Sequence, residues 1–153
     1  MLKTMNQFQI YGENNQYMMI QIGKVHGFPH TTSHSGGYDT ESSINIKSGS
    51  YCASGSVWIS TGAIYVFKNQ LQAIYEKCSG TAKLTNDEVD LEVTVMIENR
   101  GRAIIEGRYK EHPSIDNELI FFFEADQSYI GKTLEELDQI TTMYGGMNGI
   151  ISL

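Results

Sequence analysis

Three histidines are the residues of this sequence whose type and spacing most resemble a chemical site. His26, His30 and His34 are four residues apart, and acidic residues follow them closely. On a helix, this spacing would place the three imidazoles on one face, where they could bind zinc. Pro29 and the surrounding Gly, Ser and Thr residues disfavour a helix, so we predict a polar, exposed loop. A metal-dependent enzyme that uses these histidines is a less favoured alternative.

Other catalytic motifs are missing from the sequence. It contains no nucleophile elbow, phosphate-binding glycine loop, HExxH or CxxC. Trp58, near the end of a predicted strand, is expected in the core. We therefore predict a protein that is not an enzyme and binds no cofactor.

An alternation of acidic and apolar residues gives the best candidate for a binding surface. From Val89 to Ile97, apolar side chains occupy every second position, which is typical of a strand with one buried face. The acids on the opposite face, which we predict to contact a protein partner, are Glu88, Asp90, Glu92 and Glu98. The alternative is a sheet face that is merely solvated.

The elements that must position these residues form an α+β fold. Apolar residues recur at helical spacing from Ile64 to Tyr75 and from Ile130 to Ile140, which predicts helices at about 61–78 and 128–144. We expect the whole chain, residues 1–153, to be a single domain with a mainly antiparallel sheet of about seven to eight strands. The candidate N-caps are Ser60 or Thr61 for the first helix and Ser128 or Thr133 for the second.

A long loop and a strand with two apolar faces are also predicted. Residues 26–43 are rich in Gly, Ser, Thr and His and are expected to form a long loop before a strand at Ile44–Lys47. The last strand contains Leu119, Phe121 and Phe123 on one face. Because residues 120 and 122 are also apolar, this strand is expected to be covered on both sides.

The charge of the chain is concentrated in its second half. Residues 1–76 carry four basic and four acidic residues, whereas residues 77–153 carry seven basic and fourteen acidic ones, which accounts for the net charge of −7. An acidic surface repels phosphates, so nucleic-acid binding is disfavoured. It can instead steer the approach of a basic protein.

The chain shows no sign of export or membrane insertion. The start, from Met1 to Gln7, lacks the apolar run of a signal peptide, and no stretch reaches the ~20 apolar residues of a membrane span. We therefore expect a cytoplasmic protein. In that compartment, Cys52 and Cys78 are predicted to be partly buried thiols without a disulfide.

Several motifs, most of them in the second half of the chain, follow one another in a recognisable order. They are Ile59-Ser60-Thr61, Ser79-Gly80-Thr81-Ala82-Lys83-Leu84, Glu106-Gly107-Arg108-Tyr109 and the segment from Leu119 to Ile130, with a looser match at Phe8-Gln9-Ile10-Tyr11-Gly12 and Phe28-Pro29. In this order, the sequence resembles the WapI-like immunity protein family of bacterial contact-dependent, polymorphic toxin systems.

The resemblance implies a function in toxin immunity. It implies that the protein binds a cognate protein toxin and blocks it, and that this toxin is of the nuclease type. It implies neither a nucleic-acid partner nor a membrane. A further alternative from the residues themselves is a small-ligand-binding protein, whose pocket would be lined by Phe121, Phe123, Trp58 and Tyr109.

Overall fold

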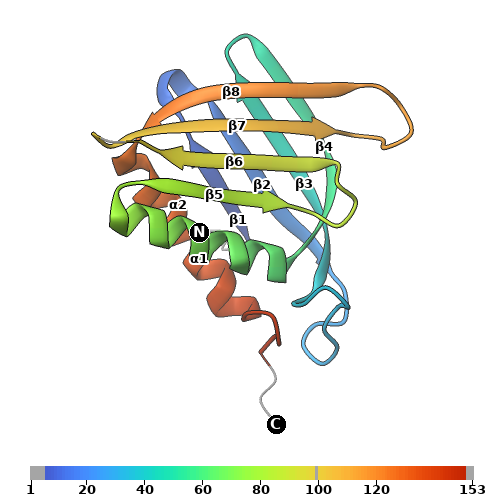
Figure 1. Cartoon of the computed structure of the whole chain (residues 1–153). Helices are drawn as coiled ribbons and strands as arrows, with labels where there is room; N and C mark the ends of the chain where they lie inside the picture. Colours follow the sequence, from blue (N-terminus) through green and yellow to red (C-terminus); the bar gives the residue numbers. More distant parts are fainter. Residues whose placement is uncertain (1–5, 99, 151–153) are drawn as a thin grey trace, which may run out of the picture.

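Two antiparallel sheets lie face to face, and two helices run along one side of them (Figure 1). The computed structural model describes residues 6–98 and 100–150. The segment that is predicted to lack a signal peptide begins at Met1, and its first five residues lie outside the described residues. The first sheet contains β1 (Gln7–Tyr11), β2 (Tyr17–Val25), β3 (Asp39–Ser48) and β4 (Tyr51–Ser60) in that order. The second contains β5 (Gly80–Thr85), β6 (Leu91–Ile97), β7 (Arg102–Lys110) and β8 (Glu118–Asp126) in that order. The helices are α1 (Thr61–Lys77) and α2 (Gln127–Tyr144), and a 3-10 turn spans Glu13–Asn15.

This architecture confirms the predicted α+β fold with two helices. In the described part of the chain the strands number eight, and within each sheet consecutive strands pair in antiparallel ladders. Inward-facing residues of both sheets join one hydrophobic core, as Val93 and Val95 of β6 do with Phe8 of β1. Gly107 allows close packing there, because a Cβ at this position would lie 2.3 Å from the Phe121 ring.

The helices cover the side of the sandwich where β1 and β5 are edge strands. Such strands leave backbone N–H and C=O groups without sheet partners. On β1, the Gln9 N–H donates to Glu136 Oε1 (2.9 Å) and the Gln9 carbonyl accepts from Thr133 Oγ1 (2.7 Å). On β5, the Lys83 backbone N–H donates to Gln70 Oε1 of α1 (2.8 Å). In the second sheet, β8 is the opposite edge (Figure 1).

The third strand is longer than the sequence predicts. β3 begins at Asp39, so the loop expected over residues 26–43 is shorter. Thr40 and Ser42 point into the core, where their hydroxyl oxygens are 2.6 Å apart and Thr40 Oγ1 donates to the Ile59 carbonyl (2.7 Å). Polar residues that pair internally can occupy buried positions, and hydrophobic periodicity does not reveal them.

The turn before β6 also differs from the prediction. β6 begins at Leu91, and Val89, expected as its first inward residue, has a φ of 56° in the preceding turn and is 62% exposed. The buried Asn86 side chain holds this turn. Its Nδ2 donates to the Trp58 carbonyl (2.9 Å) and to Asp90 Oδ1 (2.5 Å), and its Oδ1 accepts from the Leu91 N–H (3.2 Å).

Both helices start close to their predicted positions. Ser60 caps α1 as expected, with its Oγ accepting from the Ala63 N–H (3.0 Å). Asp126 caps α2 by accepting from the Ser128 N–H (3.3 Å), so the caps predicted at Ser128 and Thr133 are wrong. Within the residues that the structure describes, neither helix is both long and apolar enough to cross a membrane.

The two cysteines have different surroundings from those predicted. Cys52 on β4 and Cys78 at the end of α1 are both free thiols and both exposed, so their expected partial burial is wrong. Cys78 adopts a left-handed conformation (φ 59°), where its Sγ accepts from Gln127 Nε2 (3.1 Å). The position of Cys78 at the end of α1 explains its exposure.

Candidate functional site

The three histidines lie in separate surroundings. The His26 ring stacks on Trp58 with 5.2 Å between centroids, and its Nε2 is 2.7 Å from Glu41 Oε2. His30 and His34 are exposed in the loop between β2 and β3. Across residues 6–98 and 100–150, no group of three His, Cys, Asp or Glu side chains is arranged to hold a metal ion. The structure therefore does not bring the three imidazoles together.

The aromatic residues considered as a ligand pocket are divided between core and surface. Phe121, Phe123 and Tyr109 are buried between the sheets. The Tyr109 hydroxyl donates to the Ser56 carbonyl (2.7 Å), and burial raises the pKa of this phenol to about 12. Trp58, predicted in the core, is 44% exposed. These four aromatic side chains therefore do not line one pocket.

The four predicted partner-binding acids lie in three places. Glu88 and Asp90 belong to the turn between β5 and β6, and Glu92 lies on the outer face of β6. Glu98 follows the other end of that strand, where its N–H donates to the Arg102 carbonyl (2.8 Å). At about 3.3 Å per residue, Asp90 and Glu98 are roughly 25 Å apart along the strand. The structure thus groups Glu88 with Asp90 and separates Glu98 from them.

Like charges gather where β5 turns into β6. We call Asp39, Asp87, Glu88 and Asp90 the acidic end. Partial burial raises the pKa of Glu88, and the negative charges of the other three acids raise it further. The exposed Trp58 ring lines a small pocket with three of these acids. A lysine or arginine side chain placed there would relieve the repulsion and could also contact the ring by a cation–π interaction.

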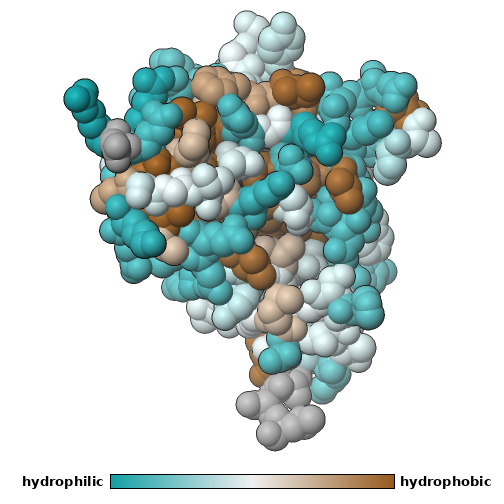
Figure 2. All heavy atoms as spheres, viewed as in Figure 1, coloured by the Kyte–Doolittle hydropathy of each residue, from teal (hydrophilic) through white to brown (hydrophobic). Residues whose placement is uncertain are grey.

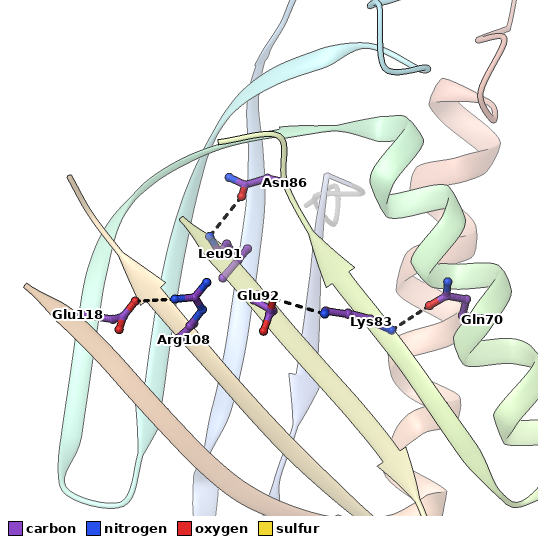
Figure 3. Close-up of polar contacts among 7 residues, drawn as sticks. All are labelled: Gln70, Lys83, Asn86, Leu91, Glu92, Arg108 and Glu118. Atoms are coloured by element: carbon purple, nitrogen blue, oxygen red, sulfur yellow. Dashed lines mark hydrogen bonds and ion pairs between the residues drawn. The ribbon is translucent and has the colours of Figure 1, made fainter. Parts of the chain in front are cut away.

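Opposite charges alternate across the outer face of the second sheet, as Figure 3 shows. Lys83 Nζ lies 3.4 Å from Glu92 Oε2, and Arg108 lies 3.3 Å from Glu118 Oε2. Glu92 and Arg108 are directly opposite each other in the β6–β7 ladder. Among the described residues, the ion pairs between strands of this face are Lys83–Glu92, Arg108–Glu118 and Arg102–Glu124, and Lys110 at the end of β7 pairs with Asp116 of the following loop. Exposed pairs of this kind contribute little to stability, but they leave the face with little net charge.

Two large apolar side chains are open to solvent on this same face. Ile120 is 75% exposed and Phe122 is 50% exposed, so the described residues do not cover β8 on both sides as the sequence predicts. Figure 2 shows apolar side chains at the surface among hydrophilic ones over the second sheet. Both residues border an open depression of about 470 Å³. Its lining residues are Glu92, Thr94, Glu106, Gly107, Arg108, Ile120, Phe121 and Phe122.

The sequence contained a signal for this surface. Leu119–Phe123 is an unbroken apolar run, whereas a strand with one wet face alternates. The sequence prediction was that a second layer of the protein covers this outer face. In the part of the chain that the structure describes, no such layer covers Ile120 and Phe122.

Comparison with known proteins identifies the family. The model of the Immunity protein WapI-like family matches residues 9–145. No match was found among curated proteins or among solved structures. The matched region runs from within β1 past the end of α2 and includes the acidic end and the outer face of the second sheet. Because the match covers most of the chain, this protein belongs to the WapI-like immunity protein family.

Proposed function

We propose that this protein neutralises a cognate bacterial toxin by binding it in the cytoplasm and blocking its activity, without catalysing a reaction itself. Membership of an immunity protein family is the observation that carries the proposal. Inhibition by binding requires a complementary surface and no catalytic group. The acidic end and the outer face of the second sheet are surfaces of that kind.

The toxin in this proposal is of the nuclease type. A nuclease must attract phosphates, so its substrate cleft is commonly basic. This chain carries a net charge of −7, all of it contributed by its second half. Opposite charges accelerate the encounter of two proteins and exclude partners of the wrong sign. An acidic inhibitor can therefore occupy the cleft in place of the nucleic acid.

The acidic end is the proposed point of contact with this basic cleft. Glu88 and Asp90 lie there together, Glu92 follows on β6 in an ion pair with Lys83, and Glu98 would contribute at the distal end of the strand. Burying a carboxylate without a partner is expensive, so each buried acid needs a lysine or arginine from the toxin. Repulsion that already raises the pKa of Glu88 would be relieved by the same contact.

A binding measurement tests the proposal. The proposal requires that the gene immediately upstream encodes a large secreted protein, and the probe is the purified carboxy-terminal domain of that protein. We expect the pair to bind, co-expression to restore growth, and association to slow as salt rises, because exposed charges are screened. Glu88→Lys should weaken binding by at least about tenfold, as loss of a close charge pair does. Glu135→Lys, an equal charge change at an exposed site on α2, is the control.

The proposal fails if the purified wild-type protein does not bind this domain and does not protect cells that express it. Equal binding by Glu88→Lys and Glu135→Lys would leave immunity standing and exclude the acidic end as the contact.

A further inference from the structure

We propose that the toxin domain docks on the outer face of β6, β7 and β8, with Ile120 and Phe122 as apolar anchors and Glu106 as the central charged contact. This inference rests on the proposed function and specifies its interface. It implies that the toxin presents an apolar surface beside a lysine or arginine.

The exposure of the two anchors is the first observation. Ile120 and Phe122 are neighbours on the outer side of β8, at 75% and 50% exposure. Exposure of large apolar side chains to water is unfavourable, and covering them with a partner lowers the free energy. Patches of such side chains mark protein interaction sites. The depression beside them gives an incoming side chain a place to insert.

The distribution of charge gives the chemistry of the partner. Four ion pairs within the described residues neutralise most of the charged side chains on this face. Glu106 is exposed and, within the described residues, belongs to none of the ion pairs. It lies directly opposite Phe122 in the β7–β8 ladder and opposite Thr94 in the β6–β7 ladder. The centre of the patch is therefore an unneutralised acid next to an aromatic ring.

A second copy of this chain does not suit such a patch. In a symmetric dimer centred on the patch, the two Glu106 carboxylates would approach each other in a surface that excludes water. Like charges that meet at an interface weaken association. A partner with a basic group at this point is complementary to the patch, and a nuclease-type toxin has that charge.

The backbone that carries the anchors is also held in place before binding. Ser48 Oγ of the first sheet donates to the Phe122 carbonyl of β8 (2.8 Å), which fixes the backbone of this edge strand. A strand with a fixed backbone loses less conformational freedom on binding, so more of the contact energy appears as affinity. The surrounding ion pairs would form the polar rim that is typical of interfaces with a small apolar centre.

The patch is continuous with the acidic end. Glu92 lines the depression, and it is separated from Asp90 only by Leu91, the first residue of β6. A toxin domain seated on the patch can therefore reach Glu88 and Asp90 at the same time. The basic cleft would face the acidic end, and an apolar rim of the toxin would cover β8.

The test measures the affinity of purified variants for the same upstream-encoded toxin domain. Phe122→Ala and Ile120→Ala should each raise the Kd, by about 30-fold or more for the stronger anchor, as expected for a central hot spot. Glu106→Lys should raise it by at least about tenfold. The matched controls are Tyr51→Ala, which removes an aromatic ring that is 71% exposed on β4, and Glu135→Lys on α2.

Each outcome decides a separate point. Thermal unfolding of every variant must match the wild type, which we expect because the replaced side chains are exposed. If the wild type binds and the three patch variants bind equally well, the docking surface is overturned and toxin immunity stands. If the wild type does not bind, both proposals fail. A wild-type dimer that Phe122→Ala converts to a monomer, with unchanged toxin affinity, assigns the patch to self-association and overturns the inference.

Discussion

Replacing Asn86 by alanine should destabilise the fold by removing the side chain that joins β4, β6 and the turn between β5 and β6. The Asn86 side-chain amide donates hydrogen bonds to the Trp58 carbonyl and to Asp90, and it accepts one from the Leu91 N–H. Leu91 is fully buried, so its N–H has little access to water once the partner is removed. A buried group left without a hydrogen bond costs about 1–3 kcal/mol. The half-exposed Trp58 segment can recover water, so that loss is nearer 1 kcal/mol.

The expected total loss in the free energy of unfolding is therefore about 2–4 kcal/mol. For a domain of this size it corresponds to a fall in Tm of roughly 5–15 °C. Urea unfolding measures the free energy directly, and an unchanged m-value would show that both states keep their compactness. The control is Asn117→Ala, at an exposed site in the loop between β7 and β8, which should stay within about 0.5 kcal/mol of wild type.

A loss below about 1 kcal/mol for Asn86→Ala would refute the reasoning. It would mean that water or a rearranged turn replaces the three hydrogen bonds. The same substitution should weaken toxin binding even where the variant is fully folded, because Asn86 also positions Asp90.

Three further outcomes follow from the polar contacts. Thr133→Val should lower the free energy of unfolding by about 1–2 kcal/mol, measured in urea, because the Gln9 carbonyl at the edge of β1 loses its donor; no change would show that the edge does not need α2. Because the folded-state pKa of Glu88 is raised, its ionisation opposes folding, so Glu88→Gln should stabilise the protein at pH 7 and not at pH 3 in thermal unfolding. Tyr109 has a folded-state pKa of about 12 against about 10 unfolded, so stability should fall as the pH rises from about 10 to about 12. Tyr109→Phe should flatten this fall and, at neutral pH, lose about 1 kcal/mol with the hydrogen bond to Ser56.

Hydrophobic periodicity was sufficient to predict most of the elements. Both helices start within a residue of their predicted positions, and the strand predicted at Ile44–Lys47 lies inside β3. The apolar alternation of β6 from Leu91 to Ile97 is also confirmed. These features are local: each depends on the spacing of apolar residues within one segment, and that spacing can be read from the chain.

Hydrophobic periodicity did not predict the polar side chains that pair across the fold. Thr40 and Ser42 are polar and buried because their hydroxyls bond inside the sandwich, so the start of β3 was missed. Asp126, rather than Ser128 or Thr133, caps α2, because the helix begins directly after β8 and Thr133 lies inside it, where its hydroxyl donates to the Gln9 carbonyl of β1.

Burial and proximity of the candidate site were decided only by the tertiary structure. The sequence determined that the second half is acidic and that β8 is apolar on both faces. Only the packing of the two sheets decided that Phe121 is buried, that Phe122 is half exposed, and that Glu88 lies near Asp39 rather than Glu98. The physical reason is that strand periodicity assigns a residue to a face, whereas the neighbouring layer determines whether that face meets protein or water.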